Sequence, residues 1–270
     1  MVFKRVSKID AKYNVFTDDK VTWRDVISTG YETNSYFFSA MAAMTLYPET
    51  LDEIFLNEKN TKGIYALKFH IRGKPWIVTI DDTLLVKYES TSYFKPVFET
   101  IHYQTHAVWS HFLFKGWAKV HGNYDSAKTG NGGTALMSLL GVPVVRHATS
   151  VGDKYEELSS ASMMWAQMKL DNDNGYEMTA KTGATSGATY GLLNDHYYTV
   201  LSVFLLEDYA TVKVNHTMVL LRDPLHERTQ WSGSFSFLSN HKNAATRNYI
   251  RDEKIPFSHV NYNNTVHGVS

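Results

Sequence analysis

Ser35, His196 and Asp223 have the residue types of a nucleophile, a general base and an orienting acid. In serine hydrolases these three groups cleave an ester or an amide through a covalent acyl intermediate. An aspartate suits a Ser–His pair because its charge stabilises the imidazolium that forms when the base takes the proton. His196 follows Ser35 at long range and Asp223 follows His196 closely, so the fold must bring distant segments together.

Cysteine is absent from the 270 residues of the chain. This composition excludes disulfides, zinc sites of the cysteine type, iron–sulfur clusters and any thiol nucleophile. A nucleophile in this chain therefore has to use oxygen or nitrogen.

The overall composition indicates a folded globular protein. Lys plus Arg and Asp plus Glu number 27 each, and 43% of the residues are hydrophobic. The zero net charge and the interleaved signs leave no electrostatic footprint for nucleic acid or an anionic membrane. The longest apolar stretches are far shorter than the roughly 20 residues that cross a bilayer. We expect no nucleic-acid partner and no transmembrane segment.

Ser35 lies in the first turn of a predicted helix. Apolar residues recur at helical spacing from residue 37 onward, and Pro48 ends the pattern. Thr33 or Asn34 can cap this helix, because both residue types accept hydrogen bonds from first-turn N–H groups.

Two further elements are predicted in the first half of the chain. Alternating apolar residues over 65–71 and 76–80, joined by a turn at 72–75, predict a β-hairpin. A helix is predicted over 109–120. Gly116 inside it costs about 1 kcal/mol relative to alanine, so this helix should depend on packing.

The composition and the hydrophobic pattern of the sequence change from residue 133 onward. Polar loops such as 171–175 and 181–187 separate strand-like runs, and the runs 201–205 and 212–221 predict paired strands. The predicted fold class is α+β, with a helical first lobe and a mostly antiparallel β second lobe.

Three motifs resemble the catalytic core of calpain-type cysteine proteases. Thr29-Gly-Tyr-Glu-Thr-Asn-Ser35-Tyr resembles the pattern Gln-Gly-x-x-Gly-Asp-Cys-Trp that opens the active-site helix of that family. Gly191-Leu-Leu-Asn-Asp-His196-Tyr-Tyr-Thr-Val is similar to the family's Gly-Leu-x-x-x-His-x-Tyr-Ser-Val. Leu221-Arg-Asp223-Pro and the following Gln230-Trp-Ser-Gly resemble Arg-Asn-Pro-Trp and Glu-Trp-x-Gly. With the hairpin and the second helix, the resemblance extends over about residues 28 to 240.

The resemblance implies the two-lobed papain-like fold of this family. It divides the chain into an N-terminal arm, 1–27; a helical lobe carrying Ser35, 28–132; a β lobe carrying His196 and Asp223, 133–240; and a C-terminal tail, 241–270. Gly130-Asn-Gly-Gly133 is then expected to be the turn between the lobes.

The same resemblance implies that the catalytic machinery is altered. Ser35 stands at the nucleophilic cysteine, Thr29 at the oxyanion glutamine and Asp223 at the orienting asparagine, whereas His196 is retained. Leu225 stands at the tryptophan that shields the asparagine. A helix N-terminus can ionise a thiol whose pKa starts at about 8.5, but a hydroxyl starts too high. Threonine is shorter than glutamine, and loss of one oxyanion donor costs about 10²–10³ in rate.

These replacements predict a catalytically inactive, calpain-like pseudoprotease. We expect it to be a structural or accessory subunit of a large intracellular complex, whose other protein subunits contact the polar tails 1–27 and 241–270. The alternative is a serine hydrolase or peptidase on the same fold that uses Ser35, His196 and Asp223. In a milder form of this alternative, the cleft binds extended peptides without cutting them.

No cofactor and no metal site are predicted. His102 and His106 would share one face of a helix, but no third ligand follows at a telling distance. Asp171-Asn-Asp173-Asn-Gly175 resembles a calcium loop, yet its glycine is fifth instead of sixth and Thr182 stands where glutamate is needed. A polar turn is the better interpretation.

Residues 1–16 are basic and lack the apolar core of a signal peptide. We therefore expect an intracellular protein, in the cytoplasm or at the cytoskeleton by default. The cationic start leaves a mitochondrial address open.

Overall fold

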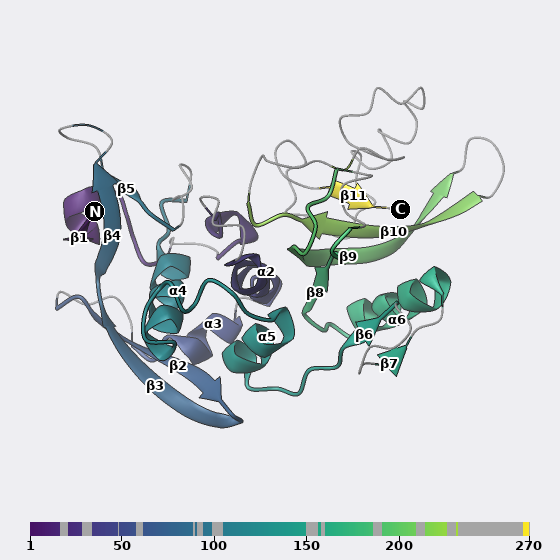
Figure 1. The fold of residues 1–270 in the computed structure, drawn as a ribbon, viewed down its shortest axis with the longest axis horizontal. Coiled ribbons are helices and arrows are strands. Elements are labelled where there is room, and N and C mark those ends of the chain that lie inside the picture. Colours follow the sequence, from purple (N-terminus) through teal and green to yellow (C-terminus); the bar gives the residue numbers. More distant parts are fainter. Residues whose placement is uncertain are drawn as a thin grey trace. The chain divides into compact units, whose positions relative to one another are not determined.

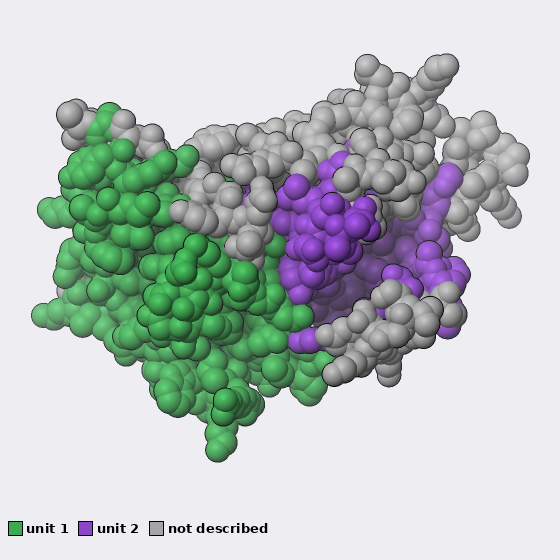
Figure 2. Space-filling view, in the orientation of Figure 1, with its two compact units in different colours: residues 1–144 green, residues 145–270 purple. Residues whose placement is uncertain are grey.

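A computed structural model describes residues 1–16, 21–28, 34–47, 49–57, 62–88, 90, 94–98, 105–149, 156–157, 160–185, 191–208, 214–225, 231 and 267–269. The chain forms two compact units, residues 1–144 and 145–270 (Figures 1 and 2). Both units combine helices with antiparallel strands, which confirms the predicted α+β class. None of the described helices is long and apolar enough to cross a membrane.

The first unit contains short helices and two small antiparallel sheets, ordered β1-β4-β5 and β2-β3. Its described elements are, in chain order, β1 (Val2–Arg5), α1 (Val6–Ile9), the 3₁₀ turn η1 (Trp23–Asp25), α2 (Ser35–Met44), α3 (Glu49–Ile54), β2 (Ile64–Ile71), β3 (Lys74–Asp81), β4 (Thr83–Tyr88), β5 (Phe94–Pro96), α4 (Trp109–Val120) and α5 (Gly132–Leu140).

The core of the first unit is built around α2, whose ten residues are all buried. The aromatic ring of Phe37 on α2 stacks on Trp117 of α4 with 4.9 Å between centroids. Gly116 lets α4 approach β2 closely, because an added Cβ would lie only 2.5 Å from Leu67 Cδ1. Gly116 therefore lies at a close packing contact between α4 and β2, and the dependence of α4 on packing stays a prediction.

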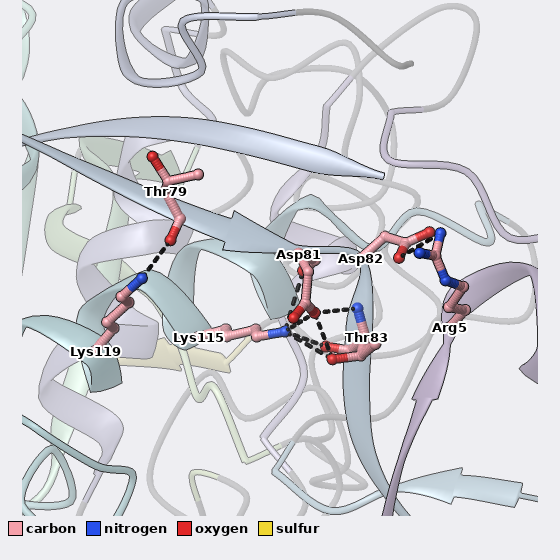
Figure 3. A network of polar contacts seen from close by, with 7 residues as sticks. All are labelled: Arg5, Thr79, Asp81, Asp82, Thr83, Lys115 and Lys119. Atoms are coloured by element: carbon pink, nitrogen blue, oxygen red, sulfur yellow. Dashed lines mark hydrogen bonds and ion pairs between the residues drawn. The ribbon is translucent and has the colours of Figure 1, made fainter. Parts of the chain in front are cut away.

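The predicted hairpin is formed by β2 and β3, and its turn residues Arg72 and Gly73 both have positive φ, 52° and 74°. Two lysines on α4 hold the far end of this hairpin (Figure 3). Lys115 Nζ donates to Asp81 Oδ1 at 2.6 Å, and Lys119 Nζ donates to Thr79 O at 2.7 Å. The lysines thus cover main-chain and side-chain oxygens at the end of β3.

The carboxyl of Asp81 is the most strongly perturbed acid in this network. Its partial burial works to raise the pKa, but hydrogen bonds from Lys115 and Thr83 outweigh that effect and lower the pKa of Asp81 from 3.8 to about 2. The next residue, Asp82, lies 3.4 Å from the guanidinium of Arg5 on β1 (Figure 3).

The N-terminal segment is part of the first unit, whereas we expected residues 1–27 to form an arm separate from the helical lobe. β1 pairs with β4 in antiparallel register, with Val2 opposite Val86. The strand is short and largely exposed, so it has no apolar alternation that the sequence could reveal. β1 is a strand because its main chain pairs with β4.

The boundary between the units lies after residue 144, not after residue 132 as expected. Gly130-Asn-Gly-Gly133 leads into α5, whose N-cap is Asn131; its side-chain oxygen accepts from Gly133 N at 2.9 Å. α5 packs against α2 and β2, and its residue Leu139 is buried. This packing places α5 in the first unit.

The second unit is built on an antiparallel sheet with the order β11-β10-β9-β8. Its described elements are β6 (His147–Ala148), β7 (Glu156–Glu157), α6 (Ala161–Asp173), β8 (Met178–Lys181), β9 (Tyr197–Asp208), β10 (Val214–Arg222) and β11 (His267–Val269). The predicted pairing of the two strand-like runs is confirmed by β9 and β10. β11 shows that residues 267–269 of the expected tail join the sheet.

The sequence did not indicate α6, which covers this sheet. Trp165 and Met168 pack against the buried cluster of β9 and β10, and Trp165 Nε1 donates to Met218 O at 3.2 Å. No residue of α6 is fully buried, so the helix lacks a strong apolar face. Asp171 and Asp173, which we expected in a polar turn, form its last turn, and Gly175 follows with a φ of 76°.

Candidate functional site

The strand register of the second unit brings His196 and Asp223 together. His196 immediately precedes β9, and Asp223 immediately follows β10. The two strands are antiparallel with Thr199 opposite Arg222, so the start of β9 lies beside the end of β10. His196 Nε2 lies 2.9 Å from Asp223 Oδ1. Two of the predicted site residues therefore make direct contact.

This pair is almost completely buried. The side chains of His196 and Asp223 are 2% and 3% exposed. The main-chain N–H of Leu225 also donates to Asp223 Oδ1, at 2.8 Å, and the Tyr198 ring lies edge-on to the imidazole at 4.8 Å. An ionised carboxylate only accepts hydrogen bonds, so it favours the imidazole tautomer that carries its proton on Nε2. Nδ1 is then the proton-accepting atom of His196.

Ser35 is the first residue of α2, in the other unit, and it is 2% exposed. The preceding residue, Asn34, occupies the N-cap position, but its side chain does not cap the helix. Instead, its Oδ1 accepts a hydrogen bond from Ser28 Oγ at 3.1 Å. The helix N-terminus carries a partial positive charge next to Ser35. Thr29, the predicted oxyanion position, lies outside the described residues.

Tyr36, the residue after Ser35, has a structural role. Its hydroxyl donates to Ala127 O at 2.9 Å and accepts from Trp117 Nε1 at 2.8 Å. Burial raises the pKa of Tyr36, and the hydrogen bond from Trp117 opposes this rise. An added Cβ on Gly130 would lie 2.4 Å from the Tyr36 ring. Tyr36 therefore anchors the start of α2 to the segment after α4.

Residues next to His196 that the sequence reasoning missed are Thr182 and Asp195. Thr182 Oγ1 accepts from the main-chain N–H of His196 at 3.0 Å. Asp195 has a φ of 51°, in the left-handed region, and its carboxylate lies 2.9 Å from Lys181 Nζ. From the sequence, Thr182 is notable only as the residue that replaces the glutamate of the calcium-loop pattern. Its contact with His196 depends on the register of β8 and β9, for which the sequence carries no signal.

The described part of the chain contains no cluster of three or more potential metal ligands. His106 has a φ of 54° and lies outside any helix, and His102 lies outside the described residues. Asp173 is paired with Lys169 one turn earlier on α6.

Comparison with known proteins relates the sequence of this chain to one family. A family model described as calpain family cysteine protease matches residues 1–254. The calpain-type cysteine protease DEK1 of Zea mays is 28% identical over 205 residues, covering 74% of this chain and 9% of that protein. Calpain clp-4 of Caenorhabditis elegans is 24% identical over 244 residues, covering 87% and 32%. Calpain-7 of Sus scrofa is 25% identical over 240 residues, covering 86% and 26%. The chain spans about a third or less of the length of these relatives.

Proposed function

Because the chain belongs to the calpain family of cysteine proteases, we propose that it is a catalytically inactive member, a pseudoprotease that serves as a structural or accessory subunit of a larger intracellular complex. The observation that carries this proposal is Ser35 at the first position of α2, in a chain without any cysteine. The family's chemistry needs a thiolate at the position that Ser35 occupies.

The physical reason is the acidity of the nucleophile. A thiol near pKa 8.5 becomes a thiolate when a helix N-terminus and an imidazolium lower its pKa by a few units. Helix charge contributes only about 0.3–2 kcal/mol, which is far too little to ionise a serine hydroxyl. A serine can react only if a general base takes its proton during attack.

The positions of Thr29 and Leu225 add to the proposal. Threonine at position 29 does not supply the long amide donor that the family uses to stabilise the developing oxyanion, and one lost donor costs about 10²–10³ in rate. Leu225 is buried beside Asp223 but cannot stack over it as a tryptophan ring would. Three features that catalysis needs are thus altered: the nucleophile at Ser35, the oxyanion donor at Thr29 and the side chain that shields the His–Asp pair at Leu225.

A role in an assembly is supported by apolar side chains on the described surface. Trp76 and Ile77 near the tip of the β2–β3 hairpin are 60% and 62% exposed. Met163 and Leu170 on α6 are also exposed. Aromatic residues and methionine are enriched at protein–protein interfaces. These residues, together with the tails, are the proposed contacts with other subunits.

The second candidate function is a serine hydrolase, and the contact between His196 and Asp223 favours it. A carboxylate 2.9 Å from Nε2 leaves Nδ1 as the proton acceptor, so the aspartate and the histidine can take the same roles as in a serine triad with the two ring nitrogens exchanged. This alternative needs Ser35 to reach Nδ1 in the intact chain. It also needs a donor other than the family's glutamine for the oxyanion.

A fluorophosphonate probe separates the two functions, because it labels a serine only when a base activates it. We expect the wild-type chain to be labelled no faster than Ser35→Ala. Labelling that disappears in Ser35→Ala and in His196→Ala would establish the hydrolase and refute the pseudoprotease.

The absence of cysteine makes Ser35→Cys a sharp second test, because its thiol is unique in the chain. We expect little peptidase activity from this variant, since the family's oxyanion glutamine is also missing. The pH dependence of alkylation by iodoacetamide then reports whether His196 reaches position 35. A rate that persists well below pH 8.5, and is lost when His196→Ala is added, indicates a thiolate–imidazolium pair. Full peptidase activity would contradict the proposed roles of Thr29, Asp223 and Leu225.

The assembly role is tested separately by size-exclusion chromatography of native lysate. The pseudoprotease proposal expects the chain in a high-mass peak. Purely monomeric elution counts against a subunit role, whatever the outcome of the labelling.

A further inference from the structure

We infer that Thr182 is a positioning residue for His196: it clamps the main chain on both sides of the histidine and thereby holds the imidazole against Asp223. Thr182 directly follows β8, and the last residue of that strand, Lys181, pairs with Tyr197 of β9. The strand register therefore places Thr182 beside His196.

The clamp consists of two main-chain contacts to His196. Thr182 N donates to His196 O at 3.0 Å, and His196 N donates to Thr182 Oγ1 at 3.0 Å. The first contact needs only a backbone and exists for any residue except proline. The second needs a hydroxyl at this position.

The same hydroxyl also secures the loop that leads to the histidine. Thr182 Oγ1 donates to Leu193 O at 2.6 Å and lies 3.2 Å from His196 O. A hydroxyl can donate only one proton, and the shorter distance indicates that Leu193 O accepts it. Thr182 thus accepts from residue 196 and donates to residue 193, so a single side chain closes the turn between them.

This turn needs such support because its backbone is strained. Asp195, inside the turn, has a φ of 51°, which is uncommon for residues other than glycine. Asp195 N donates to Gly183 O at 3.2 Å, and Leu193 N donates to Tyr198 Oη at 2.9 Å. The ion pair of Asp195 with Lys181 is exposed on both sides and contributes little. Among the side-chain contacts of this turn, the one made by the Thr182 hydroxyl is formed with the main chain of His196 itself.

Thr182 acts through the main chain and not on the imidazole. In the described structure its contacts are with main-chain atoms, whereas His196 Nε2 contacts Asp223. If the clamp opens, the turn can rotate and carry the imidazole away from the carboxylate. This inference does not rest on either proposed function, because the orientation of the ring can be measured without any reaction.

The test is nuclear magnetic resonance of the full chain with ¹⁵N-labelled histidine. The probes are the tautomer of His196 and the solvent exchange of its Nε2 proton. Thr182→Val keeps the shape of the side chain and removes the hydroxyl. We expect it to raise the exchange rate of that proton more than about tenfold, because a hydrogen bond to a buried group is lost.

Two variants serve as controls. Thr182→Ser restores the hydroxyl and should return the exchange rate to within about twofold of the wild type. Thr179→Val makes the same change elsewhere on β8 and should leave His196 unaffected. If Thr182→Val does not fold, Thr182→Ala removes the hydroxyl without a methyl group in its place. Unchanged exchange of the Nε2 proton in a folded variant without the hydroxyl, or no rescue by serine, would overturn the inference.

Discussion

Removal of either partner of the buried His196–Asp223 contact should destabilise the second unit strongly, and the two losses should not add. The side chains are 2% and 3% exposed, so water cannot replace a missing partner. Asp223 Oδ1 accepts from His196 Nε2 at 2.9 Å and from Leu225 N at 2.8 Å. A hydrogen bond to a charged group contributes about 1.5–3 kcal/mol. Asp223→Ala should therefore cost about 3–5 kcal/mol, because it also leaves two buried donors unpaired.

A double-mutant cycle isolates the pair from the other contacts of each residue. We expect a coupling free energy of about 1.5–3 kcal/mol between His196→Ala and Asp223→Ala. Asp223→Asn is the matched control, since its amide oxygen can still accept from Nε2 and from Leu225 N. It should cost about 1 kcal/mol, because a neutral acceptor is roughly half as strong.

The assay is urea unfolding combined with amide hydrogen exchange of β9 and β10, which reports on the second unit even if the units unfold separately. High salt should change the coupling little, because buried pairs are poorly screened. A coupling below about 0.5 kcal/mol, or an asparagine variant as unstable as the alanine variant, would refute the reasoning.

Three further perturbations test contacts within the first unit. Tyr36→Phe removes the acceptor of the Trp117 indole N–H, and urea unfolding should show a loss of about 1–3 kcal/mol; equal stability would mean that the indole finds another acceptor. Gly116→Ala should lower stability by about 1–3 kcal/mol despite the better helix propensity of alanine, since the new Cβ would lie 2.5 Å from Leu67; a more stable variant would show that α4 has room to shift. Because the pKa of Asp81 falls from 3.8 to about 2 on folding, its ionised form stabilises the fold above about pH 4, and this contribution is lost as the pH falls towards 2. Asp81→Asn should reduce the acid-induced loss in that window by less than about 1 kcal/mol, since the side chain is 59% exposed; an unchanged slope would contradict the lowered pKa.

The elements that the sequence predicted well are those with strong local patterns. The apolar spacing of α2 and α4 and the alternation of the β2–β3 hairpin survive in the structure almost residue for residue. β1 and α6 were missed because neither has a buried face with a clear period. Their place in the fold comes from partners far away in the chain.

In the candidate site, too, the sequence revealed some residues and missed others. His196 and Asp223 were found through motifs around them, and their contact confirms that these two motifs meet. Thr33 or Asn34 was expected to cap α2. Thr33 lies outside the described residues, and the side-chain oxygen of Asn34 accepts from Ser28 instead. Thr182 was not found, because a threonine after a short polar strand has no distinctive sequence signal. A side chain's hydrogen-bond partner is decided among competing acceptors in three dimensions.

The sequence by itself determined the chemistry that is excluded, since a chain without cysteine has no thiolate nucleophile. It also determined the α+β class and the order of the motifs, because these depend on composition and on periodicity along the chain. Only the tertiary structure decided which polar groups are paired, which are buried and which loops are clamped. Those features depend on the register between distant strands, such as Thr199 opposite Arg222, and register is set by packing over the whole unit.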